Sequence, residues 1–297
     1  MARKVKVATI SMALECRKPK NRQDNLDYIS QIIAEITPIK PDLICLPKVF
    51  PIAGLDEREK ILGPGKELLL EVAKKYQTYI VGSLYEEREG KLYNTALVVN
   101  RSGEIVGRYD KIHPTENELQ KHIIPGKKNQ LPVDTEFGKI GIQICFDANW
   151  PEDWQRQVEN GAEIIIFCSA FPGGRILNSI AVLNKVYIVS SIWSLHSGII
   201  DNTGEWIVKT DRFSWWVSSI IDLERTVFHW DWQGDKTKKI CRKYRDKVKV
   251  KTFGQEAWFV LEPNSPHISI PELIKEFNLV TYRDYIKRAT KAQRKAR

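Results

Sequence analysis

The chain has 297 residues, of which 42% are hydrophobic and 28% are charged. That share of apolar side chains is enough to bury a large core, which excludes a disordered chain. No apolar run approaches the roughly 20 residues that a membrane-spanning helix needs, and the first residues lack the features of a secretory signal, so we expect a soluble protein of the cytoplasm. The five widely spaced cysteines form no CxxC pair, and they therefore predict neither a disulfide framework nor a zinc site.

The net charge of +9 is concentrated late in the chain. Residues 236–251 carry +8 and residues 283–297 carry +6, so that the remaining residues carry a net −5. We expect both basic segments to be solvated helix faces or charged loops, without a nucleic-acid partner. The alternative is nucleic-acid binding, because basic clusters with interleaved aromatic residues suit a phosphate backbone.

Continuous apolar runs bounded by turn residues predict buried strands along most of the chain. These runs lie at residues 5–12, 43–46, 79–84, 93–100, 140–145, 163–168, 186–192 and 217–222. Segments with helical spacing of apolar residues lie between them, at residues 25–36, 154–160 and 176–185. Strand–turn–strand patterns at residues 98–109 and 199–206 predict hairpins. Strands that alternate with helices indicate a layered α/β domain.

The C-terminal part is predicted to be an extension of this domain. No sharp change of composition occurs before about residue 235, so we assign residues 1–260 to one domain and residues 261–297 to an extension that is basic at its end. Residues 271–277 have helical apolar spacing with Pro271 at a suitable first position. We expect this helix to dock on the body of the protein or on a partner subunit.

Cys145 ends one of the apolar runs. The following residues, Phe146 to Trp154, contain a Pro-Glu step that suits a helix start. A strand that stops at a cysteine and turns into a helix places the thiol near backbone N–H groups, which suits a nucleophile. The other interpretation is a structural cysteine that fills the core.

Lys111 follows a predicted strand in the sequence YDKIH at residues 109–113. By itself such a lysine is usually a solvated surface charge. Together with the cysteine segment ICFDANWPE at residues 144–152, however, it resembles the lysine and cysteine motifs of the nitrilase superfamily of carbon–nitrogen hydrolases. The resemblance extends over roughly residues 5–227 and includes the framework segments 93–96 and 197–204.

The resemblance implies a four-layer α-β-β-α sandwich and a homodimer or higher homo-oligomer that packs through helices near the cysteine motif. It also implies hydrolysis of a small amide or N-carbamoyl compound without a metal or an organic cofactor. Cys145 would attack the carbonyl carbon, while the Lys111 ammonium and the Phe146 N–H would stabilise the oxyanion. The residues CFD at 145–147 are more similar to the amidase and carbamoylase branches than to true nitrilases.

The predicted strand at residues 41–48 corresponds to a third family motif, and it departs from the family pattern at one position. Residues 41–48 read PDLICLPK, and Lys48 stands where the resemblance places a catalytic glutamate. A carboxylate accepts the thiol proton, whereas a lysine, with a reference pKa of about 10.4, is a donor. Three hypotheses follow: an amide hydrolase with impaired turnover, a nitrilase-like binding protein or inactivated variant without turnover, or an enzyme in which a neutral Lys48 acts as the base.

Further candidate site residues are found by comparing other positions with the family pattern. Glu118, seven residues after Lys111, matches the second glutamate of the family and is expected either to orient substrate or to form an ion pair with Lys48, and Glu116 is its nearest rival. Ile180 and Leu183 stand where the family usually has an ion pair. The aromatic residues that we expect to wall the pocket, or else to pack in the core, are Phe146, Trp150, Phe171 and Trp193.

Overall fold

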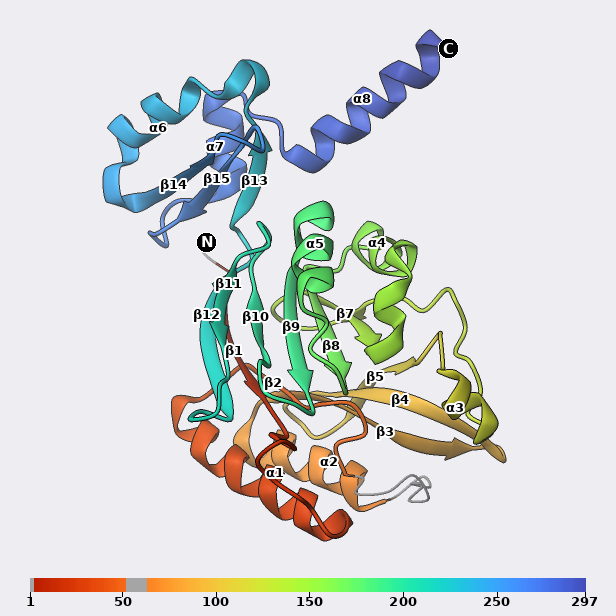
Figure 1. Cartoon of the computed structure of the whole chain (residues 1–297). Coiled ribbons are helices and arrows are strands. Elements are labelled where there is room, and N and C mark those ends of the chain that lie inside the picture. The colour runs from red at the N-terminus through yellow and green to blue at the C-terminus, as the bar shows by residue number, and fades with distance from the viewer. Residues whose placement is uncertain (1–2, 52–62) are drawn as a thin grey trace. The chain divides into compact units, whose positions relative to one another are not determined.

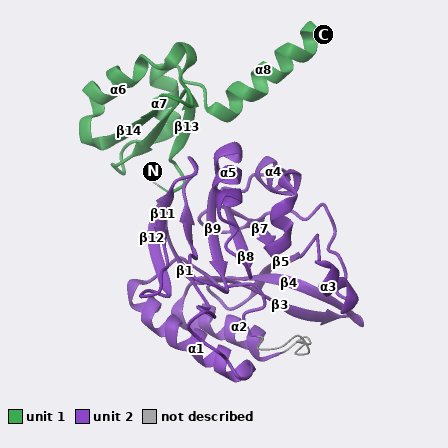
Figure 2. Ribbon diagram, viewed as in Figure 1, with its two compact units in different colours: residues 1–4, 222–297 green, residues 5–221 purple. Residues whose placement is uncertain are grey.

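The computed structural model describes residues 3–51 and 63–297. They form two compact units, one of residues 5–221 and one of residues 1–4 with 222–297 (Figure 2). The division predicted after residue 260 lies inside the second unit, within a strand (Trp258–Pro263).

The first sheet of the larger unit has the strand order β12-β1-β2-β3-β4-β5. β1, β2 and β3 are parallel neighbours, whereas β3, β4 and β5 pair in antiparallel fashion. The strands are β1 (Lys4–Ile10), β2 (Leu43–Cys45), β3 (Tyr79–Arg88), β4 (Lys91–Val99), β5 (Ile105–Asp110) and β12 (Trp216–Asp222). The carboxyl ends of β1 and β2 therefore point the same way, which brings the residues that follow them to one edge of the sheet.

The second sheet has the order β11-β10-β9-β8-β7-β6, with β7, β8 and β9 parallel. Its strands are β6 (Val133–Asp134), β7 (Lys139–Ile144), β8 (Ile164–Ser169), β9 (Tyr187–Ile192), β10 (Gly198–Ile200) and β11 (Trp206–Lys209). The predicted hairpins are present as the antiparallel pairs β4–β5 and β10–β11.

Helices cover the outer face of each sheet (Figure 1). α1 (Arg22–Ile36) and α2 (Pro64–Tyr76) share an apolar cluster with the first sheet, and α4 (Pro151–Glu159) and α5 (Arg175–Asn184) share one with the second. α1 begins because the Asn21 side chain accepts a hydrogen bond from the Asp24 N–H at 3.0 Å. Its buried residues, Leu26, Ile29, Ile33 and Ile36 among them, repeat every three or four positions.

The two sheets pack against each other through their inner faces. Ser191 Oγ on β9 donates a hydrogen bond to the carbonyl oxygen of Cys45 on β2 at 3.1 Å, and Thr9 Oγ1 on β1 donates one to the carbonyl oxygen of Ser190 at 2.7 Å. Helix, sheet, sheet and helix thus follow one another, which confirms the predicted α-β-β-α sandwich.

The second unit has its own sheet and core. Its sheet has the order β13-β15-β14, formed by β13 (Thr226–His229), β14 (Val248–Phe253) and β15 (Trp258–Pro263). Its helices are α6 (Lys236–Tyr244), α7 (Ile270–Phe277) and α8 (Tyr282–Ala296). α7 is the helix predicted over 271–277, and its buried Ile270 and Leu273 pack with Phe228, Phe259 and other apolar residues of this unit. Across the described residues, no helix is long and apolar enough to cross a membrane.

Candidate functional site

Lys48 lies just after β2 and its side chain is almost completely buried. The next residue, Val49, has a φ of 45°, in the left-handed region that a β-branched residue rarely adopts. The backbone holds this conformation with the Val49 N–H donating to Ser83 Oγ at 2.9 Å. Strained backbone of this kind often lies at functional sites, because the surrounding structure must fix it.

Lys111 directly follows β5, and its side chain is buried as well. It faces Glu118 on α3 (Glu116–Gln120). The helix starts with a capping box, in which the Thr115 side chain accepts from the Glu118 N–H and the Glu118 carboxylate accepts from the Thr115 N–H at 2.9 Å. The capping box therefore fixes the Glu118 carboxylate near the end of β5. Its rival Glu116 is exposed.

The Glu118 carboxylate lies between two ammonium groups. Lys48 Nζ is 2.8 Å from Glu118 Oε1, and Lys111 Nζ donates to Glu118 Oε2. Asn94 Nδ2 also donates to Oε1, at 3.0 Å. The ion pair between Lys48 and Glu118 that was expected from the sequence is thus present.

This arrangement fixes the charge of Glu118. Burial would raise the pKa of its carboxyl, but the charges of Lys48 and Lys111 and their hydrogen bonds lower it to about 2. For Lys111, burial and then the charge of Lys48 lower the pKa, against the opposing effects of Glu118 and Cys145. Glu118 is consequently ionised at neutral pH, and each of its two carboxylate oxygens already contacts a lysine ammonium group.

Cys145 begins a short 3-10 helix (Cys145–Asn149) at the carboxyl end of β7. Its φ is 52°, so the chain turns sharply at this residue, and its side chain is 7% exposed. Lys111 and Tyr85 both interact electrostatically with the Cys145 thiol. Burial raises the pKa of Tyr85, and the neighbouring Glu118 and Cys145 add to this effect. The structure thus brings Lys48, Lys111, Glu118 and Cys145 together from four separate segments.

Asp147 is a further member of the site that the sequence analysis did not single out. Its buried carboxylate accepts hydrogen bonds from the Ile144 N–H at 3.0 Å, the Tyr109 hydroxyl at 3.0 Å and the His113 N–H at 2.8 Å. Burial raises its pKa to about 6, although these hydrogen bonds act in the opposite direction. Asp147 ties the Cys145 turn to the segment that carries Lys111, and its place two residues after Cys145 was the available signal.

The four predicted pocket aromatics have different surroundings. Trp193 Nε1 donates to the carbonyl oxygen of Lys48, and its ring lies 5.9 Å from Lys48 Nζ. Phe146 and Trp150, in edge contact at 5.2 Å, line a hollow of about 630 Å³ together with His113 and Thr115. Phe171 instead packs edge-on against Phe167 in the core beneath α4 and α5.

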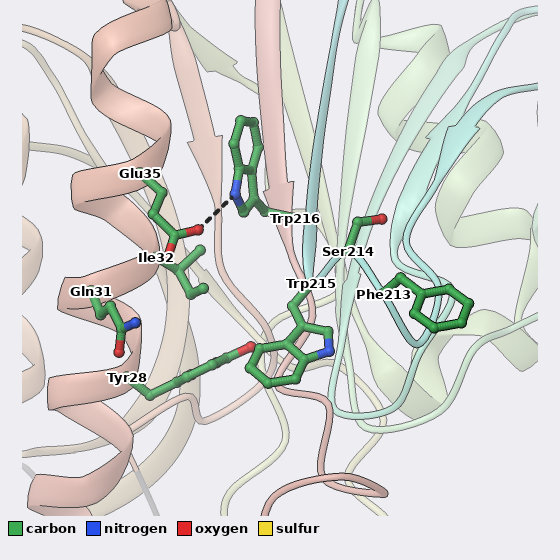
Figure 3. A pocket seen from close by; sticks show the side chains of 8 residues that line it. All are labelled: Tyr28, Gln31, Ile32, Glu35, Phe213, Ser214, Trp215 and Trp216. Carbon is green, nitrogen blue, oxygen red and sulfur yellow. Dashed lines mark hydrogen bonds between the residues drawn. The ribbon is translucent and has the colours of Figure 1, made fainter.

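Another hollow of the larger unit, about 390 Å³, is formed by α1 and the segment before β12 (Figure 3). The Tyr28 and Trp215 rings face it, and Trp216 Nε1 donates to Glu35 Oε2 at 3.2 Å. None of the predicted site residues lies in it. Among the described residues, no group of three or more His, Cys, Asp or Glu side chains is placed to hold a metal ion.

Comparison with known proteins agrees with this architecture. The family model for carbon-nitrogen hydrolases matches residues 6–226. The chain belongs to the carbon-nitrogen hydrolase family of the nitrilase superfamily. It is 30% identical over 237 residues to omega-amidase NIT2 of Danio rerio, covering 69% of this chain and 85% of that protein.

Two further relatives are less similar in sequence. "Hydrolase C26A3.11" of Schizosaccharomyces pombe is 27% identical over 227 residues, which cover 65% of this chain and 70% of that protein. The crystal structure of Saccharomyces cerevisiae Nit3, of branch 10 of the nitrilase superfamily, matches with a TM-score of 0.63 at 22% identity. The match covers 74% of this chain and 90% of Nit3, and at that identity it shows the fold.

Proposed function

We propose that this carbon-nitrogen hydrolase acts on a small non-peptide amide or N-carbamoyl compound, with Cys145 as the nucleophile. Membership of the family and the similarity to omega-amidases support an amide as the substrate class. The position of Cys145 at a sharp strand-to-helix turn, with Lys111 beside it, supports the assignment of the nucleophile. Phe146 and Trp150 would contact substrate in the neighbouring hollow.

The proposed acylation step makes one bond and breaks one. The Cys145 sulfur bonds to the carbonyl carbon, and the Lys111 ammonium stabilises the negative oxygen. The carbon–nitrogen bond then breaks, the departing nitrogen takes the proton that the thiol gives up, and a thioester remains. Hydrolysis of the thioester needs a water molecule that loses a proton to a base, and it regenerates the thiol and releases a carboxylic acid.

The ion pair of Lys48 with Glu118 is the observation that supports a slow second step. Lys48 occupies the position where the family resemblance expects the base, and as an ammonium 2.8 Å from a carboxylate it has no lone pair to accept a proton. Glu118 is a poor substitute, because a carboxyl with a pKa of about 2 holds a proton weakly. We therefore propose that the native chain forms the thioester slowly and hydrolyses it more slowly still.

A binding protein without any acylation is the alternative, and the ion pair at the position of the base is the observation in its favour. Intact-mass spectrometry separates the two. The native chain, incubated with a panel of small amides and N-carbamoyl compounds, is expected to gain the mass of an acyl group, which peptide mapping places on Cys145. The Cys145→Ala variant is the matched control and should gain none. Absence of an adduct from the native chain, with substrate binding retained, would favour the binding protein.

A further inference from the structure

The second unit accounts for the net positive charge of the protein. Residues 1–4 and 222–297 have a formal net charge of +10, whereas residues 5–221 have −1. The sequence alone favours solvated helix faces for the basic segments. The structure adds that both segments belong to one compact unit with a core of its own. This common location makes a shared binding role for the two segments more favourable than the sequence alone indicates.

The basic residues of α8 are the most exposed of this unit. It has no buried residue over its 15 positions. Its basic residues are Arg283, Lys287, Arg288, Lys291, Arg294, Lys295 and, at the end of the chain, Arg297. Within the described residues none of these seven forms an ion pair, whereas Lys243 on α6 is paired with Glu276 at 2.6 Å.

The arrangement of these charges is unfavourable for an isolated helix. Lys287, Lys291 and Lys295 follow one another at i, i+4 spacing, so like charges lie side by side along one face. Residues past 288 add no apolar side chain larger than alanine that could bury this part of the helix. A helix of this kind is stabilised by a partner that supplies negative charge along its length.

The start of α8, by contrast, is held firmly. Thr281 caps it by accepting from the Asp284 N–H at 3.1 Å, and the Tyr285 hydroxyl donates to Asp231 Oδ2 at 3.0 Å. The Tyr285 ring also contacts Trp232 edge-on at 5.1 Å. The unit therefore presents a fixed basic helix, about 22 Å long at 1.5 Å per residue, whose far part touches little.

We propose that this unit binds double-stranded DNA, with α8 in the major groove and the exposed basic residues of α6 as additional phosphate contacts. The major groove of B-DNA, about 12 Å wide, admits an α-helix, whereas the deep and narrow groove of A-form RNA does not. A membrane surface fits less well, because a helix that lies on a bilayer needs a broad apolar face and α8 offers Ile286 as its one large aliphatic side chain. The contacts are to phosphates, so the binding discriminates little between base sequences.

Fluorescence anisotropy with the full chain and a labelled 20-base-pair duplex of mixed sequence tests this proposal. We expect a Kd of roughly 10⁻⁴–10⁻⁶ M at physiological salt, which tightens steeply as the salt concentration falls. The variant Lys287→Gln/Lys291→Gln/Arg294→Gln/Lys295→Gln should reduce the slope of log K against log salt by about 3 to 4. Circular dichroism and the melting temperature report whether the variant is folded, and its four sites are all exposed.

A matched control replaces four exposed lysines of the larger unit, Lys20, Lys74, Lys75 and Lys127, by Gln and leaves the second unit unchanged. This variant should bind as the native chain does. The proposal is overturned if the duplex does not bind at 50 mM salt, or if the control weakens binding as much as the α8 variant. It is also overturned if vesicles with 30% phosphatidylserine, or a duplex RNA of equal length, bind more tightly than the DNA.

Discussion

Glu118 supplies the negative charge that holds two lysines in the interior of the larger unit. Removal of a buried carboxylate of this kind lowers the free energy of unfolding more than removal of an exposed one, because it leaves the buried positive charges without a partner. The pKa of Glu118 falls from 4.5 to about 2 on folding, so the carboxylate stabilises the protein fully above about pH 4.5. This contribution is lost as the pH falls toward about 2.

Substitution Glu118→Gln therefore has a defined pH dependence. At pH 7 we expect a loss of about 3–5 kcal/mol in the free energy of unfolding, measured by urea denaturation. The difference from the native chain should shrink as the pH falls from about 4.5 to about 2. The control Glu116→Gln removes an exposed carboxylate of the same helix and should cost little at any pH. An equal loss at pH 3 and pH 7 would contradict the ion-pair explanation.

The cysteines should differ in their reaction with iodoacetamide. Cys45 and Cys168 are completely buried, and burial raises the pKa of Cys168 to about 12 and that of Cys45 well above its usual value. They should stay unlabelled in the native protein, whereas Cys145, beside Lys111 at the strand end, should react fastest. Peptide mapping measures the order of labelling. Faster labelling of the exposed Cys16 and Cys241, with Cys145 inert, would count against Cys145 as the nucleophile.

At the scale of single elements, α5 presents two large apolar side chains that are exposed on the single chain. Leu183 is 75% exposed and Ile176 is 40% exposed, and at a separation of seven residues they lie on one side of the helix. The family resemblance implies a homodimer that packs through helices near the cysteine motif, and a pair of such faces suits a two-fold interface.

Substitution Leu183→Glu should then shift the protein from dimer to monomer, as measured by light scattering coupled to gel filtration. Leu131→Glu is a suitable control, because Leu131 is 67% exposed but lies outside α5. A native chain that is already a monomer, or a dimer that survives Leu183→Glu, would refute an interface at this face.

Most elements with a regular apolar pattern could be predicted from the sequence, whereas α2 and the elements within the basic run were not predicted. All eight apolar runs are strands, and the helices predicted from apolar spacing are present. In residues 236–251, by contrast, Ile240 and Val248 are the buried residues, and two apolar positions are too few to show a helical or strand pattern. The sequence of this basic segment therefore does not predict α6 or β14. The Asp147 network depends on hydrogen bonds between distant segments, which no local pattern records.

On the scale of the whole molecule, the division into units depends on contacts that are distant in sequence. The carbonyl oxygen of Arg3 accepts from the Leu223 N–H at 3.0 Å, which ties the first residues to the C-terminal unit. The boundary that composition predicts, after residue 260, therefore differs from the division between the two units at residue 222. The sequence could single out Lys48, Lys111, Glu118 and Cys145, because each lies in or next to a recognisable motif, and their catalytic roles stay predictions.

Two truncations test which part of the C-terminal unit is structural. A chain that ends after residue 261 lacks α7 and the buried Leu273 and Leu279, so its melting temperature should fall. A chain that ends after residue 281 lacks only α8, which buries no residue, and its melting temperature should stay close to that of the native chain. Differential scanning calorimetry measures both. Equal melting temperatures for all three chains would show that α7 does not contribute to the core of this unit.

The central claim is that Lys48 limits turnover at a site that is otherwise assembled for amide hydrolysis. The direct test is kcat for a small amide that acylates Cys145, measured for the native chain, Lys48→Glu and Lys48→Gln, because kcat includes hydrolysis of the thioester whereas kcat/KM ends with acylation. A general base contributes typically 10²–10⁴-fold, so Lys48→Glu should raise kcat by at least about 100-fold. Lys48→Gln removes the charge without supplying a base, and it should not raise it. A native chain that already turns over at an ordinary enzymatic rate, and that Lys48→Glu slows, would instead make Lys48 the working base and contradict the account.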